Sequence, residues 1–128
     1  MSPPKQEPQL IQEADGIIAI HKPAGYLTHP AGGNDAPDIA TWLDAQAQLQ
    51  GARPAHRLDL PVSGVLLCAK DAALRADIGR MLAEDQSQKT YTALVHGVTR
   101  KKGVIRRKLK DARRKKSLEA TTTYRRVE

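Results

Sequence analysis

The sequence has few aromatic residues, a single cysteine and no long apolar run. Phenylalanine is absent and aromatic residues make up 3% of the 128 residues, so any stacking platform must come from Tyr26, Trp42, Tyr91 or Tyr124. One cysteine excludes an internal disulfide. No apolar run approaches the length of a membrane span, and the first residues form no apolar signal segment. We therefore expect a soluble, cytoplasmic protein.

Residues that usually bind metals are also sparse. The four histidines and Cys68 show no metal-ligand spacing, so we predict no metal. Cys68 lies within the apolar run Val65–Ala69. We expect it to be a small buried side chain and not a reactive thiol.

The positive charge of the chain is concentrated near its end. The net charge is +7, but residues 100–128 hold 13 of the 21 Lys and Arg residues and only 3 of the 14 acids, a net +10. Residues 1–99 carry a net −3. A basic segment of this kind suits the phosphate backbone of a nucleic acid. From charge alone, a solvated loop is an equal alternative.

The pattern of apolar residues predicts one domain that mixes strands and helices. Residues 1–12, with three prolines, are expected to form an extended or disordered lead-in. Asp38 and Asp71 stand where they can cap two helices. We expect strands at 17–20, 64–70, 89–97 and 120–127, another beginning at 104–105, helices at 39–49 and 71–82, and loops at 21–33 and 106–117. This is an α+β fold class.

The sharpest candidate site is Asp59, which follows His56, Arg57 and Leu58 and precedes the apolar strand expected at 64–70. A carboxylate in a turn at the edge of a rigid strand is well placed for catalysis. Spacing alone favours a simpler interpretation, in which Asp59 only supplies an Asx-type turn before Pro61.

Four stretches resemble, in the correct order, the RluA type of RNA pseudouridine synthase. His56-Arg57-Leu58-Asp59 followed by Ser63-Gly64 resembles the signature of that family. The other similar stretches are 15–25 with its Lys-Pro-x-Gly loop and the 27–30 that follows, 88–97 with Lys-x-Tyr-x-Ala, and 119–124 with Ala-x-Thr-x-Tyr. The resemblance covers roughly residues 13–127. It implies a mixed, mainly antiparallel sheet with flanking helices.

The resemblance implies an enzyme that converts uridine in ribosomal or transfer RNA to pseudouridine, with no metal or organic cofactor. Asp59 matches the family's catalytic aspartate, which attacks the sugar or base, or removes a sugar proton. Arg57 matches an arginine that fills the space left by the flipped base. Tyr91 matches the family's active-site tyrosine, a second catalytic candidate that packs against the base and can take part in proton transfer.

Each of these residues also has an alternative role. Arg57 could be a surface arginine that pairs with a neighbouring acid, and Tyr91 could pack across strands. His56 could contact RNA or make a structural hydrogen bond. Lys22 could contact phosphate or a motif carboxylate, or could be a surface lysine beside a turn.

The basic run between 106 and 116 is predicted to contact the RNA backbone, which adds affinity more than sequence choice. Its candidate RNA-binding residues are Arg106, Arg107, Lys108, Arg113 and Arg114. We expect residues 100–118 to be a mobile basic segment.

The chain departs from the family in two ways. Leu60 stands where a basic or polar residue is common in the family, and Val62 stands where threonine is common. No part of 100–128 resembles the family's later motif, which includes the basic partner of the aspartate. We therefore expect 13–128 to be a partial, apparently truncated catalytic domain with weak or absent catalysis on its own. The alternatives are a non-catalytic RNA-binding module and a small ribosome-associated basic protein without a site.

Overall fold

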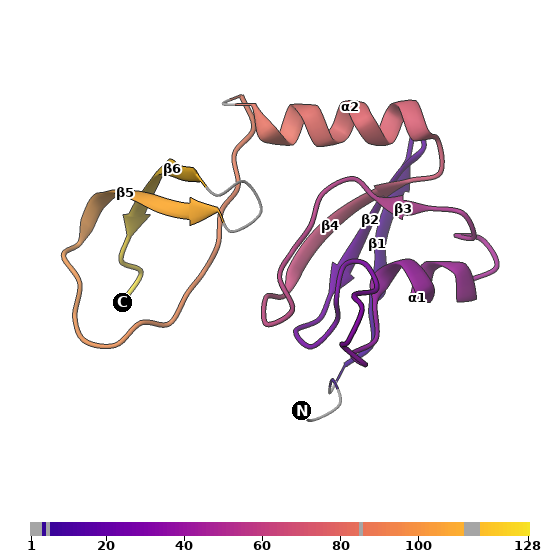
Figure 1. Ribbon diagram of the computed structural model, residues 1–128, viewed down its shortest axis with the longest axis horizontal. Coiled ribbons are helices and arrows are strands. Elements are labelled where there is room, and N and C mark those ends of the chain that lie inside the picture. Colours follow the sequence, from indigo (N-terminus) through magenta and orange to yellow (C-terminus); the bar gives the residue numbers. More distant parts are fainter. Residues whose placement is uncertain (1–3, 5, 85, 112–115) are drawn as a thin grey trace. The chain divides into compact units, whose positions relative to one another are not determined.

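The computed structural model of the chain describes residues 4, 6–84, 86–111 and 116–128. They divide into two compact units, Met1–Lys89 and Thr90–Glu128. The first unit contains a four-stranded sheet and two helices, and the second contains a two-stranded sheet (Figure 1). The expected mixture of antiparallel strands with a few helices is confirmed.

The sheet of the first unit has the strand order β1-β2-β4-β3, and every neighbouring pair is antiparallel. Its strands are β1 (Gln9–Ala14), β2 (Ile17–Lys22), β3 (Arg53–Pro54) and β4 (Gly64–Ala69). Asp15 and Gly16 join β1 to β2 with φ values of 53° and 82°, as in the two-residue turns typical of hairpins. Since β1 begins at Gln9, the last four residues of the expected lead-in belong to the sheet.

Alternate residues of β2 and β4 form the centre of the core. Ile18 and Ile20 pair with Cys68 and Leu66 respectively, and none of the four is more than 1% exposed. Because side chains alternate along a strand, the next residue on this face of β2 is Lys22. It is also fully buried.

Both helices begin at the expected caps. The carboxylates of Asp38 and Asp71 accept hydrogen bonds from the main-chain N–H groups of Thr41 (2.8 Å) and Leu74 (2.7 Å). They start α1 (Ile39–Ala45) and α2 (Ala72–Ala83). Helix α1 is shorter than the predicted 39–49, because the next residue is extended and the chain turns there.

A glycine brings α2 close to the chain that precedes Asp59. A Cβ atom placed on Gly79 would lie 2.8 Å from the carbonyl oxygen of Ala55, closer than carbon and oxygen approach in proteins. The missing side chain therefore lets the helix touch the main chain at the start of the motif.

The second unit is a long antiparallel hairpin of β5 (Lys102–Asp111) and β6 (Lys116–Arg125). The prediction of a loop over 106–117 is wrong, since its described residues belong to these strands. The high charge of β5 favoured a loop in the sequence, but β5 pairs along its whole length with the Thr-rich β6. The mobility expected for 100–118 stays a prediction.

The strand expected over 89–97 is absent, because no neighbour among the described residues pairs with this segment. Its β-prone composition is insufficient without a partner strand. In the described part of the chain, neither helix has the length and apolar character needed to cross a membrane.

Candidate functional site

Asp59 lies in the loop that joins β3 to β4. Its main-chain carbonyl accepts a hydrogen bond from the N–H of Val62 at 2.9 Å, which closes a four-residue turn. Because a main-chain hydrogen bond closes this turn, the turn does not require the carboxylate of Asp59 as an acceptor. The side chain of Asp59 is 73% exposed and is accessible to a substrate.

Thr28 holds the main chain next to Asp59. Its hydroxyl accepts a hydrogen bond from the N–H of Leu58 (3.1 Å) and donates one to the carbonyl of Leu58 (2.8 Å). On the other side of Asp59, the carbonyl of Leu60 accepts the N–H of Gly25 at 2.8 Å. The loop after β2 therefore fixes both neighbours of the candidate catalytic residue.

Thr28 was not predicted as a site residue. It is 5% exposed, and its bonding partner is 30 positions away in the sequence. The only signal in the sequence was the resemblance of 27–30 to a family stretch, which suggests importance without suggesting a contact.

Lys22 fastens the same loop from inside. Its ammonium donates hydrogen bonds to the carbonyls of Pro23 (3.1 Å) and Tyr26 (2.6 Å). Burial lowers the pKa of Lys22, while the negative charge of Asp59 acts in the opposite direction. Predictions of a surface lysine or a phosphate contact are corrected, because Lys22 is fully buried. The alternative of an electrostatic interaction with the motif carboxylate fits the structure.

His56 extends the pairing of the sheet through its side chain. Its Nε2 accepts a hydrogen bond from the N–H of Leu67 at 3.0 Å, beside the bond from the Ala55 N–H to the Leu67 carbonyl at 2.8 Å. The ring thus replaces a main-chain acceptor next to β4. Burial, and secondarily the charge of Lys89, lower the pKa of His56. His56 therefore makes a structural hydrogen bond, which is one of its two expected roles. Its contact with RNA stays a prediction.

Arg57 lies at the surface beside Asp59. Its Nη2 is 3.5 Å from Oδ1 of Asp59, with the two side chains 62% and 73% exposed. Such an exposed pair contributes little to stability. The guanidinium can therefore leave this contact at little cost, and its contact with RNA stays a prediction.

Tyr91 belongs to the second unit, where its side chain is 62% exposed and lies outside any strand. The alternative of cross-strand packing is therefore not what the structure shows. Its contact with a uridine base stays a prediction.

The basic candidates divide between the two faces of the hairpin. Arg106, Arg107 and Lys108 are consecutive on β5 and all exposed. Alternation places Arg106 and Lys108 on one face and Arg107 on the other. Arg113 and Arg114 lie outside the described residues.

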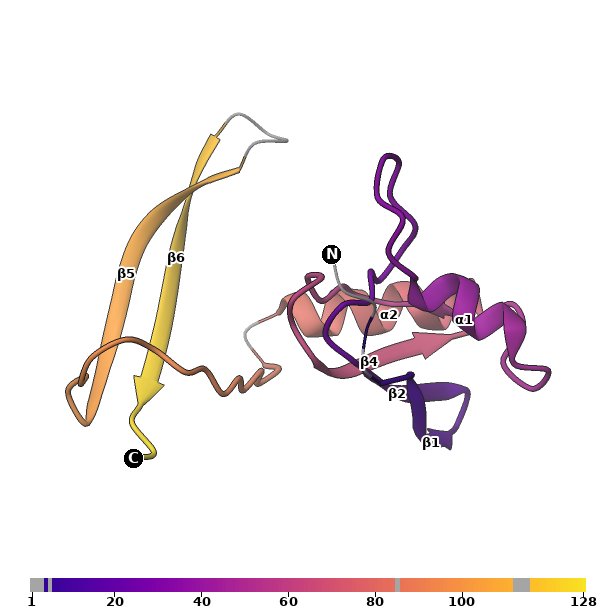
Figure 2. The same cartoon turned by 90° about the horizontal axis from the view of Figure 1, so that it is seen from below.

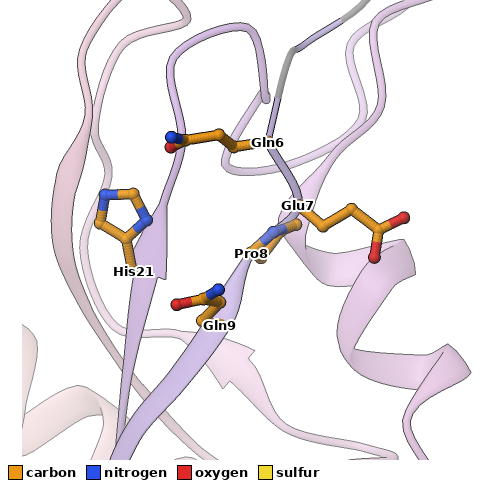
Figure 3. Close-up of a pocket in the computed structure, with 5 residues that line it drawn as sticks. All are labelled: Gln6, Glu7, Pro8, Gln9 and His21. Carbon is orange, nitrogen blue, oxygen red and sulfur yellow. The ribbon is translucent and has the colours of Figure 1, made fainter.

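One hollow lies elsewhere and contains none of the predicted site residues. It has a volume of about 580 Å³ and is lined by Gln6, Glu7, Pro8, Gln9 and His21. Figure 3 shows His21 and Gln9 on neighbouring strands, with the Glu7 carboxylate pointing away from them. With no convergent charged groups, we assign it no ligand.

The described part of the chain shows where Cys68 and the side chains of metal-binding types lie. Its His, Cys, Asp and Glu side chains form no group of three that could hold a metal ion. Cys68 is buried, and burial raises the pKa of its thiol to about 12. The prediction of a small buried side chain at Cys68 is confirmed.

Comparison with known proteins adds independent information. The model of the RNA pseudouridylate synthase family matches residues 16–128. The tRNA pseudouridine synthase C of Vibrio parahaemolyticus is 31% identical over 139 residues, covering 92% of this chain and 52% of the relative. The tRNA pseudouridine synthase C of Yersinia pestis is 35% identical, and the match covers 76% of this chain and 38% of the relative.

A relative with a different name is equally similar. The ribosomal large subunit pseudouridine synthase D of Nitrosomonas europaea is 35% identical, covering 76% of this chain and 29% of the relative. The chain thus spans about half or less of the length of these relatives. No solved structure matches it. From the family match and the order of its motifs, the chain belongs to the RNA pseudouridylate synthase family, in its RluA type.

Proposed function

We propose that this chain carries the catalytic carboxylate of an enzyme that isomerises uridine in transfer or ribosomal RNA to pseudouridine. The observation that carries the proposal is the exposed Asp59 side chain on a turn in which the main-chain groups of both neighbours are fixed by hydrogen bonds. A catalytic group must be held in one geometry while it remains accessible. The names of two relatives, a tRNA pseudouridine synthase and a ribosomal large subunit pseudouridine synthase, supply the two RNA classes.

The reaction rearranges bonds without any net change in oxidation state. The bond between N1 of uracil and C1′ of ribose breaks, and a bond between C5 and C1′ forms. C5 loses its proton and N1 gains one. The ionised carboxylate of Asp59 acts either as the nucleophile that holds the sugar or base, or as the base that removes a sugar proton.

The remaining site residues serve access to the base. A stacked uridine must leave its helix before the reaction, at a cost in stacking and pairing energy. Arg57, exposed next to Asp59, offers a planar cation that can occupy the vacated space. Tyr91, also exposed, offers a ring on which the base can stack.

The test is pseudouridine formation on an unmodified tRNA transcript by the full chain. Asp59→Asn keeps the shape of the side chain but removes its charge. We expect the rate to fall by on the order of 10⁴-fold, as for loss of a catalytic residue. Asp35→Asn removes the same charge from an exposed loop position and should leave the rate unchanged. Pseudouridine formed by Asp59→Asn at the same measurable rate as by the wild type would contradict the proposal.

A second candidate function is a non-catalytic RNA-binding module, favoured by the exposed basic residues of β5. It predicts salt-sensitive RNA binding that is indifferent to Asp59→Asn. RNA binding by the wild type without any pseudouridine would show that this chain acts as a binding module or as an inactive fragment on the synthase scaffold.

A further inference from the structure

The β5–β6 hairpin has two chemically different faces. Figure 2 shows β5 and β6 side by side as one long twisted ribbon. Residues directly opposite each other point to the same side, and the side alternates along each strand. The register therefore assigns one set of cations to a single side, here called the basic face: Lys102, Arg106, Lys108 and Lys110 of β5 and Arg125 of β6.

The basic face has little to neutralise it. Among its described side chains, Glu119, which lies opposite Lys108, is the single acid, so the face carries a net +4. Its other residues are Val104, Ser117, Thr121 and Thr123. All of the side chains on this face are exposed. Short hydroxyl side chains leave the cations accessible and add donors for phosphate oxygens.

The opposite side, here called the apolar face, has another character. Leu109 and Leu118 are direct partners there, and Ile105 lies on the same side four residues before Leu109. Tyr124 lies across Gly103 so closely that a Cβ atom on the glycine would be 2.6 Å from the tyrosine oxygen. This contact locks the register, since a one-residue slip would exchange the faces.

We propose that the basic face is the surface on which the hairpin docks the sugar-phosphate backbone of RNA, an inference that rests on the proposed function. Eight residue steps from Lys102 to Lys110 extend for about 26 Å at roughly 3.3 Å per residue. A cationic row of this length contacts several phosphates and reads no bases. Arg107, although next to Arg106 in sequence, points away from this row and takes no part in docking.

The test compares two double variants that change the net charge equally. Arg106→Gln/Lys108→Gln removes two cations from the basic face, and Arg107→Gln/Lys116→Gln removes two from the apolar face. Affinity for an unmodified tRNA transcript is measured by fluorescence anisotropy between 50 and 200 mM KCl. The full chain with Asp59→Asn serves as background, so that no turnover occurs. Circular dichroism checks that each variant keeps its strands.

Each phosphate contact adds about 0.7–0.9 to the slope of log affinity against log salt. The basic-face variant should therefore reduce this slope by about 1.4–1.8, whereas the apolar-face variant should keep it. When KCl is raised from 50 to 200 mM, the affinity of the background chain should therefore fall by roughly tenfold more than that of the basic-face variant. A reduction in the basic-face variant alone supports the proposal.

Three results would overturn it. Equal reductions in both variants would mean that binding follows net charge, and no reduction in either would mean that RNA docks elsewhere. A basic-face effect on vesicles with anionic lipid, without one on RNA, would assign the face to a membrane. Pseudouridine formation, scored separately with Asp59 intact, decides the proposed function, so the two can fail independently.

Discussion

The two units of the molecule differ in what their side chains do. In the first unit, Ile20 and Leu66 are completely buried, and hydrogen bonds between distant loops hold the turn around Asp59. In the second unit, Leu109 and Leu118 remain 59% and 42% exposed. The described hairpin has no second layer of its own, and a lone two-stranded sheet is marginally stable.

This difference suggests a division of tasks. A catalytic carboxylate needs a rigid support, because a small displacement costs much of the rate. A row of cations that binds phosphates tolerates a less rigid support, because charge interactions depend weakly on direction. The first unit therefore suits the placement of Asp59, and the hairpin of the second unit suits contact with phosphates.

The largest expected effect tests this contrast in stability. Leu66→Ala should lower the free energy of unfolding by about 2–5 kcal/mol, because it leaves a cavity in the core. Leu109→Ala should change it by less than about 0.5 kcal/mol, because that side chain is already exposed. Urea unfolding followed by Trp42 fluorescence and by circular dichroism measures both. Similar losses would show that the hairpin is as well packed as the core.

A smaller effect is expected at the link between the two loops of the first unit. Thr28→Val keeps the shape but removes the hydroxyl that bonds to both main-chain groups of Leu58. Leaving these groups unsatisfied should cost about 1–3 kcal/mol. Thr28→Ser keeps the hydroxyl and loses one methyl group, which costs about 1 kcal/mol or less.

The activities of the two Thr28 variants sharpen the result. If Thr28 positions Asp59, the valine variant should have a lower kcat with little change in KM. The serine variant should have a kcat close to that of the wild type. Urea midpoints and pseudouridine rates of both variants are the measurements. A serine variant as impaired as the valine variant would show that the methyl group, and not the hydroxyl, matters.

Local patterns allowed much of the first unit to be predicted from sequence. The apolar runs at 17–20 and 64–70 gave β2 and β4, and the acids Asp38 and Asp71 mark the starts of both helices. Each of these signals depends on neighbours within about four residues. The Asp59 turn was recognisable for the same reason.

Contacts between distant residues were not predictable in this way. Lys22 continues the buried face of β2. A lysine at the end of an apolar run gives no sign, however, that carbonyls of the following loop will accept hydrogen bonds from its ammonium group. Likewise, the basic run of β5 becomes a strand because the Thr-rich β6 pairs with it. Such pairing is a property of two segments together.

The smallest effect concerns pH and the ring of His56. Because burial lowers its pKa in the folded chain, the unfolded chain binds more protons between that folded pKa and 6.5. The stability contributed by neutral His56 is therefore complete above about pH 6.5 and is lost as the pH falls through this window. His56→Gln still offers an acceptor to the Leu67 N–H but cannot titrate. Between pH 7.5 and 5, urea midpoints of the wild type should fall further than those of this variant.

The exposed His96 of the second unit provides the control, since His96→Gln should retain the wild-type pH dependence. If His96→Gln rather than His56→Gln flattened it, the pH-sensitive contact would belong to the second unit, and the contrast between the units would be reversed.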